Sequence, residues 1–210
     1  MVSDIVLRLK NALKKPLPGI EAQYRMAPSS RGRFPVETLD PSTITQGAVL
    51  ILLFVNEKDI YFPLIERVSY EGPHGWQISL PGGKKDPQDF SLEDTALREC
   101  FEEIGIGQEI EILGKLTSLY IPVSKFLVEP YVAACYLKDP EFIPHQREVK
   151  QVIRMKLTDL ISDNNGTVGT VTYGNGLSLK CPYYLVAEKQ VWGATAMILS
   201  ELREVIKTTS

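Results

Sequence analysis

Histidine and cysteine are scarce in this sequence, and their scarcity limits the metal and redox chemistry that it can carry. The 210 residues include three cysteines and two histidines. The cysteines are widely spaced, odd in number and embedded in apolar segments, which favours reduced core thiols over a disulfide framework or a zinc site. Two histidines also argue against a histidine-rich metal centre. These residues are Cys100, Cys135, Cys181, His74 and His145.

Long apolar runs and an excess of positive charge are absent as well. No run of about 18 apolar residues occurs, so neither a transmembrane helix nor a membrane partner is expected. Residues 1–15 lack the apolar core and the small-residue cleavage site of a secretory signal. The formal net charge of −3 argues against a protein that binds nucleic acid through a basic face. These absences predict a cytoplasmic protein without nucleic-acid partners.

Apolar residues make up 44% of the chain, which is enough for a sizeable core. We expect a single globular domain overall, with an N-terminal helix and irregular arm over residues 1–43 and the main domain over residues 44–207. Apolar side chains at helical spacing place the first helix within residues 3–14. No internal repeat, low-complexity tract or second domain is apparent.

The rest of the chain alternates between strand patterns and turn formers. Residues 47–55 and 60–67 are expected to form a hairpin of two strands, because four turn-forming residues separate two apolar runs. A helical turn is expected at residues 158–162 and a terminal helix from residue 191. The other predicted strands are residues 110–120, 128–137, 148–157, 167–173, 177–179 and 182–187.

The segment of residues 80–106 carries the strongest local signals. The Pro-Gly-Gly sequence at 81–83 predicts a turn whose backbone can approach a ligand closely. Ser91 is a suitable N-cap with Asp94 three residues later, and Gly105 stands where a helix would end. A helix is therefore expected between Ser91 and Gly105.

Three carboxylates on this helix, Glu99, Glu102 and Glu103, are expected within a wedge roughly 100° wide. Alone they would repel one another by a few tenths of a kcal/mol per pair. Arg98 can pair with Glu102, but one guanidinium leaves two carboxylates uncompensated. Carboxylates of this kind bind Mg²⁺ together with substrate phosphates. The residues by themselves leave a solvated acidic face open as the alternative.

The spacing of these residues resembles the signature of the Nudix hydrolases, G-x5-E-x7-R-E-U-x-E-E-x-G-U, where U is a bulky aliphatic residue. Residues 98–106 match the second half at every fixed position, with Cys100 at a U position. The spacing from Gly83 to Arg98 is one residue longer than in the signature, so Phe90 occupies the first Glu position when counted back from Arg98, and Asp89 lies beside it. The extra residue is a feature in which this chain resembles the coenzyme A pyrophosphatase branch. We interpret Asp89 as the replacement for the first glutamate of the signature.

Two further stretches resemble the same branch. Residues 67–79 precede the glycine pair in a similar way, and the Trp-Gly sequence at 192–193 resembles the entry into the branch's last helix. Gly72, Trp76 and Leu80 stand where the branch usually has Arg, Gly and Phe. These departures leave the exact substrate open.

The resemblance implies an α+β Nudix fold, a mixed β-sheet sandwiched between α-helices (α/β/α). It implies an enzyme that uses Mg²⁺ or Mn²⁺ to split coenzyme A or its derivatives into 3′,5′-ADP and 4′-phosphopantetheine. A Nudix hydrolase of another nucleoside diphosphate derivative, such as ADP-ribose, NADH or a dinucleoside polyphosphate, is the alternative. A non-catalytic binding module is disfavoured by the intact acidic cluster. The implied partner is a small nucleotide, and a homodimer is open.

The resemblance also implies the site residues. Arg98 is expected to orient Glu102, and the proton of the attacking water is assigned first to Glu99 and second to Glu148. The three arginines of the arm, Arg25, Arg31 and Arg33, could bind phosphate or be solvated. Expected metal ligands are Glu99, Glu102, Glu103 and a carbonyl of Gly82 or Gly83. The catalytic set is Arg98, Glu99, Glu102, Glu103 and Glu148, and the substrate-binding set is Arg67, His74, Gln77 and Lys84.

Overall fold

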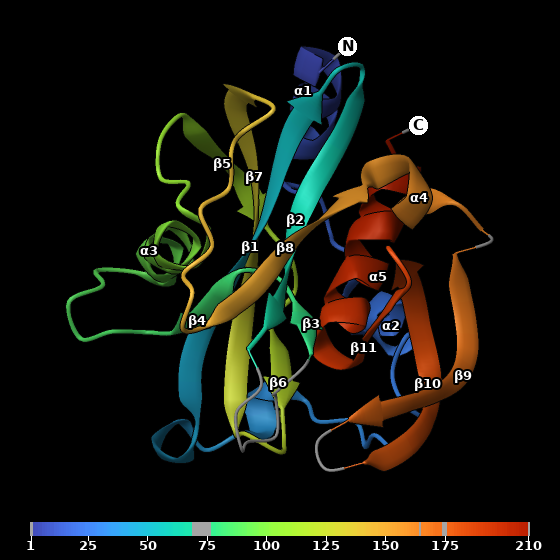
Figure 1. Ribbon diagram of the computed structural model, residues 1–210. Helices are drawn as coiled ribbons and strands as arrows, with labels where there is room; N and C mark the ends of the chain where they lie inside the picture. Colours follow the sequence, from blue (N-terminus) through green and yellow to red (C-terminus); the bar gives the residue numbers. More distant parts are fainter. Residues whose placement is uncertain (1, 69–76, 164, 174–175, 210) are drawn as a thin grey trace.

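The computed structural model describes residues 2–68, 77–163, 165–173 and 176–209, which form a mixed sheet with helices on both faces (Figure 1). A smaller antiparallel sheet lies beside it. The strands of the large sheet are β1 (Thr45–Asn56), β2 (Asp59–Arg67), β3 (Ile78–Ser79), β4 (Gly82–Lys84), β5 (Ile110–Lys115), β6 (Leu119–Ile121), β7 (Phe126–Lys138) and β8 (Val149–Lys156). Those of the small sheet are β9 (Gly166–Tyr173), β10 (Leu177–Val186) and β11 (Lys189–Trp192).

Helices of very different lengths surround the sheets. Two single 3₁₀ turns, η1 (Val36–Thr38) and η2 (Pro41–Thr43), lie in the arm that leads into β1. The α-helices are α1 (Val2–Ala12), α2 (Gly19–Tyr24), α3 (Leu92–Ile104), α4 (Leu157–Ile161) and α5 (Gly193–Lys207). Among the described residues, no helix is both long and apolar enough to cross a membrane.

The large sheet has the order β3-β2-β1-β7-β5, and β4, β6 and β8 pair with β1, β7 and β2 respectively. The pairing of β1 with β7 is parallel, whereas β1 with β2 is the antiparallel hairpin that the turn residues predict. β4 lies antiparallel to the first half of β1, with Ala48 opposite Gly83. The two glycines at 82–83 therefore belong to a short strand, which corrects the expectation of a simple turn.

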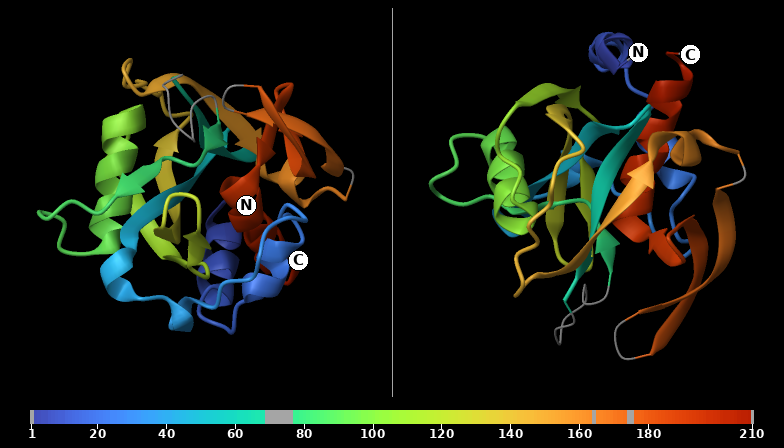
Figure 2. Two further views of the ribbon diagram at one scale, coloured as in Figure 1. Left: turned by 90° about the horizontal axis from the view of Figure 1, so that it is seen from below. Right: turned by 45° about the horizontal axis from the view of Figure 1, so that its top comes forward.

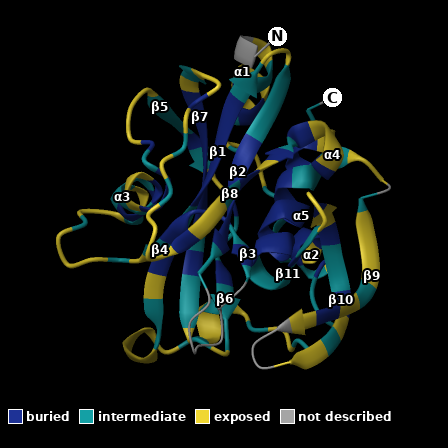
Figure 3. Cartoon of the chain, viewed as in Figure 1, coloured by how far each residue is buried: buried dark blue, intermediate teal, exposed yellow. Residues whose placement is uncertain are grey.

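Strand β1 is buried on both faces, as its unbroken apolar run predicts. Leu50 and Leu52 belong to a cluster with Cys100 of α3, while Ile51 belongs to a second cluster with Leu199 of α5. Figure 2 shows α3 on one side of the sheet and α5 on the other, and Figure 3 shows that the buried residues concentrate between them. This arrangement confirms the expected sandwich of helices around a mixed sheet.

Helix α3 begins and ends at the predicted residues. The Ser91 hydroxyl accepts a hydrogen bond from the Asp94 N–H at 3.1 Å, and the Asp94 carboxylate accepts one from the Ser91 N–H at 2.9 Å. Gly105 takes a left-handed conformation with φ of 79° at the other end. The capping box and the glycine thus set the length of the helix that carries the acidic residues.

The structure also differs from expectation elsewhere. Residues 110–120 divide into β5 and β6, the two strands expected at 177–179 and 182–187 form the single strand β10, and β11 was not predicted. Residues 19–24 form α2 within the segment expected to be irregular, because the buried carboxylate of Glu201 in α5 accepts hydrogen bonds from the Gly19 N–H and the Gln23 amide. The terminal helix begins at Gly193 and not at residue 191, since Trp192 ends β11. The three cysteines are free and buried, as predicted.

Candidate active site

Glu99, Glu102 and Glu103 of α3 lie in a row that runs from the protein interior to solvent. The side chain of Glu103 is 1% exposed, that of Glu99 is 15% exposed and that of Glu102 is 55% exposed. Helical spacing predicts that they point in similar directions, but β4 and Arg67 cover one end of the row. The carboxylates therefore share the direction that helical spacing predicts without sharing an environment.

Arg98 holds the exposed half of this row. Its Nη1 atom donates to both Glu99, at 2.9 Å, and Glu102, at 3.0 Å. Its Nε and Nη2 atoms each lie 2.9 Å from the carboxylate of Asp89, and Nη2 also donates to the Lys84 carbonyl at 3.1 Å. The predicted pairing with Glu102 is confirmed. Asp89, which the sequence predicts as the replacement for the first signature glutamate, pairs with the same guanidinium.

The electrostatics differ along the row. The Arg98 guanidinium holds the pKa of Asp89 well below its usual range. Burial raises the pKa of Glu103 to about 7 against the opposing effect of Arg67, and burial also raises the pKa of Glu99. The charge of Glu99 adds to the rise at Glu103, and that of Glu102 adds to the rise at Glu99. A cation placed beside these carboxylates would relieve both the repulsion and the cost of burial.

The buried end of the row is held by Arg67 and Gly82. Glu103 Oε2 accepts a hydrogen bond of 2.8 Å from the Gly82 N–H, and Glu103 Oε1 lies 2.9 Å from Arg67 Nη2. Arg67 Nη2 donates its hydrogen bond to the Gly82 carbonyl at 2.9 Å, so Oε1 forms an ion pair but no hydrogen bond among the described groups. An oxygen of Glu103 therefore retains capacity to accept.

The donor set fits a hard divalent cation that substrate helps to bind. In the described ranges, no three His, Cys, Asp or Glu side chains converge closely enough to hold a metal by themselves. Mg²⁺ is usually held by one or two carboxylates together with substrate phosphates and water, not by a cage of protein ligands. Glu99 and Glu103 are carboxylates whose charge is disfavoured by burial, as such a site requires.

Gly82 and Gly83 allow β4 to pass directly against α3. A Cβ atom on Gly83 would lie 2.5 Å from the carboxyl carbon of Glu99, so the Glu99 carboxylate rests on the bare glycine backbone. Gly82 has φ of 151°, and a Cβ there would lie 2.3 Å from the Ala48 carbonyl oxygen. Close approach of the backbone, more than a turn, is why these positions are glycine.

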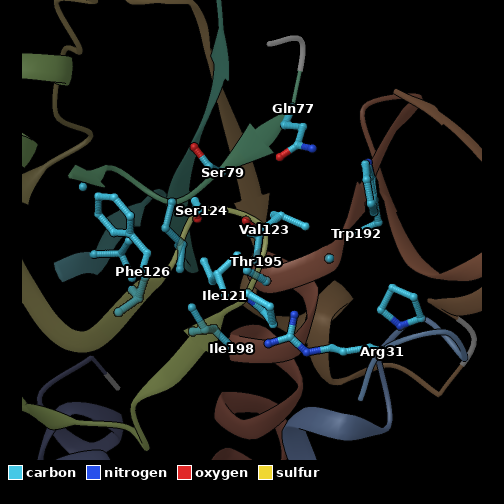
Figure 4. A pocket seen from close by; sticks show the side chains of 18 of the residues that line it. Arg31, Gln77, Ser79, Ile121, Val123, Ser124, Phe126, Trp192, Thr195 and Ile198 are labelled. Carbon is cyan, nitrogen blue, oxygen red and sulfur yellow. The ribbon is translucent and has the colours of Figure 1, made fainter. Parts of the chain in front are cut away.

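A cavity of about 1080 Å³ begins at this glycine strand (Figure 4). Gly82, Gly83 and Arg67 form part of its wall next to the acidic row, and Gln77 and Ser79 extend that wall. The remaining walls come from the N-terminal arm, the β6–β7 connection, β10 and the start of α5. Most of these side chains are apolar or aromatic: Phe34, Ile121, Val123, Phe126, Leu179, Trp192 and Ile198.

The residues predicted to bind substrate differ in their position relative to the cavity. Arg67 and Gln77 line the cavity, whereas the side chain of Lys84 is exposed and lies outside the described cavity wall. His74 lies outside the described residues. Glu148 is 56% exposed and its carboxylate is 3.6 Å from His145, yet its charge is near enough to help raise the pKa of Glu103.

Several cavity residues come from segments that sequence reasoning did not assign to the site. Phe34 and Thr195 carry no local signal that could have placed them there, while Trp192 belongs to a recognised Trp-Gly sequence without an assigned role. Arg31 lines the cavity, but Arg25 and Arg33 pair with carboxylates elsewhere. Only the folded chain separates these three arginines.

Comparisons with known proteins agree with this geometry. A family model described as NUDIX domain matches residues 44–170. The chain is 35% identical over 187 residues to the mitochondrial coenzyme A diphosphatase NUDT8 of Homo sapiens, an alignment that covers 88% of this chain and 72% of the relative. It is 31% identical over 164 residues to the uncharacterized Nudix hydrolase NudL of Photorhabdus laumondii, covering 77% of this chain and 84% of the relative.

A solved structure supports the fold alone. The MutT/nudix family protein from Enterococcus faecalis matches with a TM-score of 0.54 at 19% sequence identity. The match covers 84% of this chain and 66% of that one. At this identity the likeness concerns the arrangement of sheet and helices and carries no information on substrate.

Proposed function

The chain belongs to the Nudix hydrolase family, and on this basis we propose that it cleaves the pyrophosphate of coenzyme A or its derivatives to 3′,5′-ADP and 4′-phosphopantetheine. The observation that carries the proposal is the meeting of the acidic row of α3 with one end of a large cavity at Gly83. The similarity over most of the chain to a relative named as a coenzyme A diphosphatase supports the choice of substrate.

The carboxylates of α3 would bind the divalent cation on which the reaction depends. Glu99, Glu102 and Glu103, with a backbone carbonyl of Gly82 or Gly83, are the proposed ligands for Mg²⁺ or Mn²⁺. Substrate phosphates would complete the coordination, because the described carboxylates do not converge closely enough to hold a metal by themselves. When bound, such an ion neutralises charge on the pyrophosphate and lowers the pKa of a water molecule. Because Gly83 lines the cavity and Glu99 lies against it, the scissile pyrophosphate would lie at this end of the cavity.

Other groups in the site have separate tasks. Glu99 is the proposed acceptor of the water proton, because its largely buried carboxylate lies against the Gly83 backbone at the end of the cavity. Glu148 is the second candidate, since it is exposed close to Glu103. Arg98 orients Glu99 and Glu102, while Arg67 fixes Glu103 and the Gly82 carbonyl.

The proposed substrate-binding residues would contact the substrate from different places. Gln77 and Arg67 would contact substrate from the cavity wall next to the glycine strand. Lys84 is exposed just beyond β4 and would reach only a phosphate that projects from the cavity. A cytoplasmic location and a homodimer also stay predictions, and the human relative is named as a mitochondrial protein.

A substrate panel tests the proposed function. Purified protein is incubated with coenzyme A, ADP-ribose, NADH and diadenosine polyphosphates in Mg²⁺ or Mn²⁺, and the products are identified by mass. We expect release of 3′,5′-ADP from coenzyme A, loss of this activity with EDTA and its recovery when either metal is added back in excess. Faster cleavage of another nucleotide would overturn the substrate assignment, and no cleavage of any would favour a binding module.

Replacing Gly83 with alanine tests the contact between β4 and the acidic row. The new Cβ would meet the carboxyl end of Glu99, a flexible group that can move aside, so the fold should tolerate the change. A displaced Glu99 should lower kcat by about 10- to 100-fold, because shifts of about 1 Å at a reacting group have effects of this size. Activity assays measure the change in kcat, and thermal unfolding of the same preparation measures whether the fold is retained.

Gly166→Ala is a suitable control for this variant. Gly166 lies in β9, and a Cβ there has its nearest neighbour at an ordinary contact distance of 3.9 Å. Its activity and melting temperature should match those of the parent protein. Full activity in Gly83→Ala would show that Glu99 need not rest against β4.

A further inference from the structure

Arg31 places a positive charge inside the cavity without a carboxylate beside it. Arg31 lies in the arm between α2 and η1. Figure 4 shows its side chain extending from the arm toward Ile121 and Ile198. Nη2 donates to the Tyr120 carbonyl, and the guanidinium lies 5.9 Å from the centroid of the Tyr24 ring. Within the part of the chain that the structure describes, Arg31 forms no ion pair, and its buried Nε has no hydrogen-bond partner.

The other two arginines of the arm are paired differently. Arg25 lies 2.9 Å from Glu204 of α5, and Arg33 Nη2 donates to Glu21 of α2 at 3.1 Å. Neither of them lines the described cavity wall. Arg31 is therefore the member of the trio that the fold directs into the cavity while leaving its charge uncompensated.

A positively charged guanidinium without a carboxylate partner is unfavourable among apolar side chains unless an anion binds to it. Burial disfavours a charge that lacks a partner, and the planar donors of arginine match the oxygens of a phosphate. Phe34 and Trp192 line the same cavity and provide aromatic surface suited to a purine ring. The cavity thus contains aromatic side chains that can stack on a nucleotide base and a guanidinium that can bind an anionic group of the same nucleotide.

Different parts of the cavity wall offer different chemical groups. Gly82, Gly83 and Arg67 form the part of the wall that borders the acidic row, whereas Arg31 enters from the N-terminal arm. A nucleotide whose pyrophosphate lies at Gly83 would present its remaining parts to the other walls. The nucleotide half of coenzyme A carries one further phosphate, a monoester on the 3′ carbon of the ribose.

We propose that Arg31 binds this 3′-phosphate and is the residue by which the enzyme distinguishes 3′-phosphorylated nucleotides from those without that group. The inference rests on the proposed function, because the 3′-phosphate belongs to the substrate proposed there. It assigns substrate discrimination to the N-terminal arm, which lies outside residues 44–170, the segment that matches the family model.

The first experiment measures binding without turnover or metal. Thermal unfolding is followed with 3′,5′-ADP and with 5′-AMP, which differ only in the 3′-phosphate, for the parent protein and for Arg31→Gln. The parent should be stabilised more by 3′,5′-ADP than by 5′-AMP, and Arg31→Gln should lose that difference. Arg33→Gln, whose native side chain pairs with Glu21 outside the cavity, should keep it.

The second experiment measures turnover of coenzyme A and of 3′-dephospho-coenzyme A. Arg31→Gln should lower kcat/KM for coenzyme A by about 10- to 100-fold, mainly through KM, because it removes a charge-assisted contact. Its kcat/KM for the dephosphorylated substrate should stay within about twofold of the parent value. Arg31→Lys should recover part of the preference, since it keeps the charge without the planar fork.

The outcomes separate this inference from the proposed function. An equal loss on both substrates, or the same loss in Arg33→Gln, would show that Arg31 only supports the arm and would overturn the inference. If the parent cleaves both substrates equally and 3′,5′-ADP protects no better than 5′-AMP, the inference fails while the proposed function stands. If neither substrate is cleaved but protection by 3′,5′-ADP depends on Arg31, the subsite stands and the proposed reaction fails.

Discussion

Replacing Glu102 with glutamine is expected to lower kcat/KM for pyrophosphate hydrolysis by about 100- to 1,000-fold and to leave the fold intact. The reduction is of the size seen when one group that stabilises developing charge is removed from an active site. The fold should survive because the side chain is 55% exposed and its one described polar contact is with Arg98. Glutamine keeps the shape of the side chain and removes the negative charge that would bind the metal.

Glu93→Gln provides the matched control for this variant. Glu93 is also exposed and lies in the first turn of α3, six positions before Glu99, the first of the other three glutamates. Its replacement removes the same charge from the same helix and should leave kcat/KM unchanged. Steady-state kinetics over a range of Mg²⁺ concentrations measures both variants, and full activity in Glu102→Gln would refute the assignment of this glutamate to the metal.

Replacing Arg67 with methionine is expected to destabilise the protein by about 2–3 kcal/mol near neutral pH, because it leaves Glu103 buried without its cation. The cost is limited because burial already raises the pKa of Glu103 to about 7, so the carboxyl group can take up a proton. Glu103 is 1% exposed and Arg67 is 23% exposed, so solvent screens this pair weakly. Activity should fall as well, since Arg67 also holds the Gly82 carbonyl. The loss is a large share of a typical stability of about 5–15 kcal/mol.

Urea denaturation of two further variants makes this prediction specific. The double variant Arg67→Met/Glu103→Gln should recover much of the lost free energy of unfolding, because no uncompensated charge remains buried. Lys150→Met removes one cation from Glu66, which is also buried but keeps Lys189 and Gln151 as partners, so its cost should be about 1 kcal/mol. Equal costs for Arg67→Met and Lys150→Met would contradict the explanation.

The site shows how far helical spacing can be trusted. It correctly predicts that Glu99, Glu102 and Glu103 lie along one side of α3 and that Arg98 reaches Glu102. It does not predict how much each glutamate is buried, because that depends on β4 and Arg67 packing over one end of the row. The raised pKa of Glu103 is a property of this packing and not of the helix.

The sequence by itself determined the elements whose causes are local. The cap at Ser91, the glycine at 105 and the apolar run of β1 each depend on residues a few positions apart, so their pattern is sufficient to predict α3 and the central strand. The same holds for the order of the signature residues, which lie within one short segment and are sufficient to indicate the family. Interactions at short sequence separation leave few alternatives.

Only the tertiary structure decided which distant residues meet. Helix α2 is held by Glu201, whose partner Gly19 is 182 positions away, and six residues are too few to form a stable helix alone. Arg31 enters the cavity while Arg33, two residues later, faces Glu21, and nothing in their local sequence separates them. Burial and charge at the site depend on contacts between remote segments, which periodicity cannot encode.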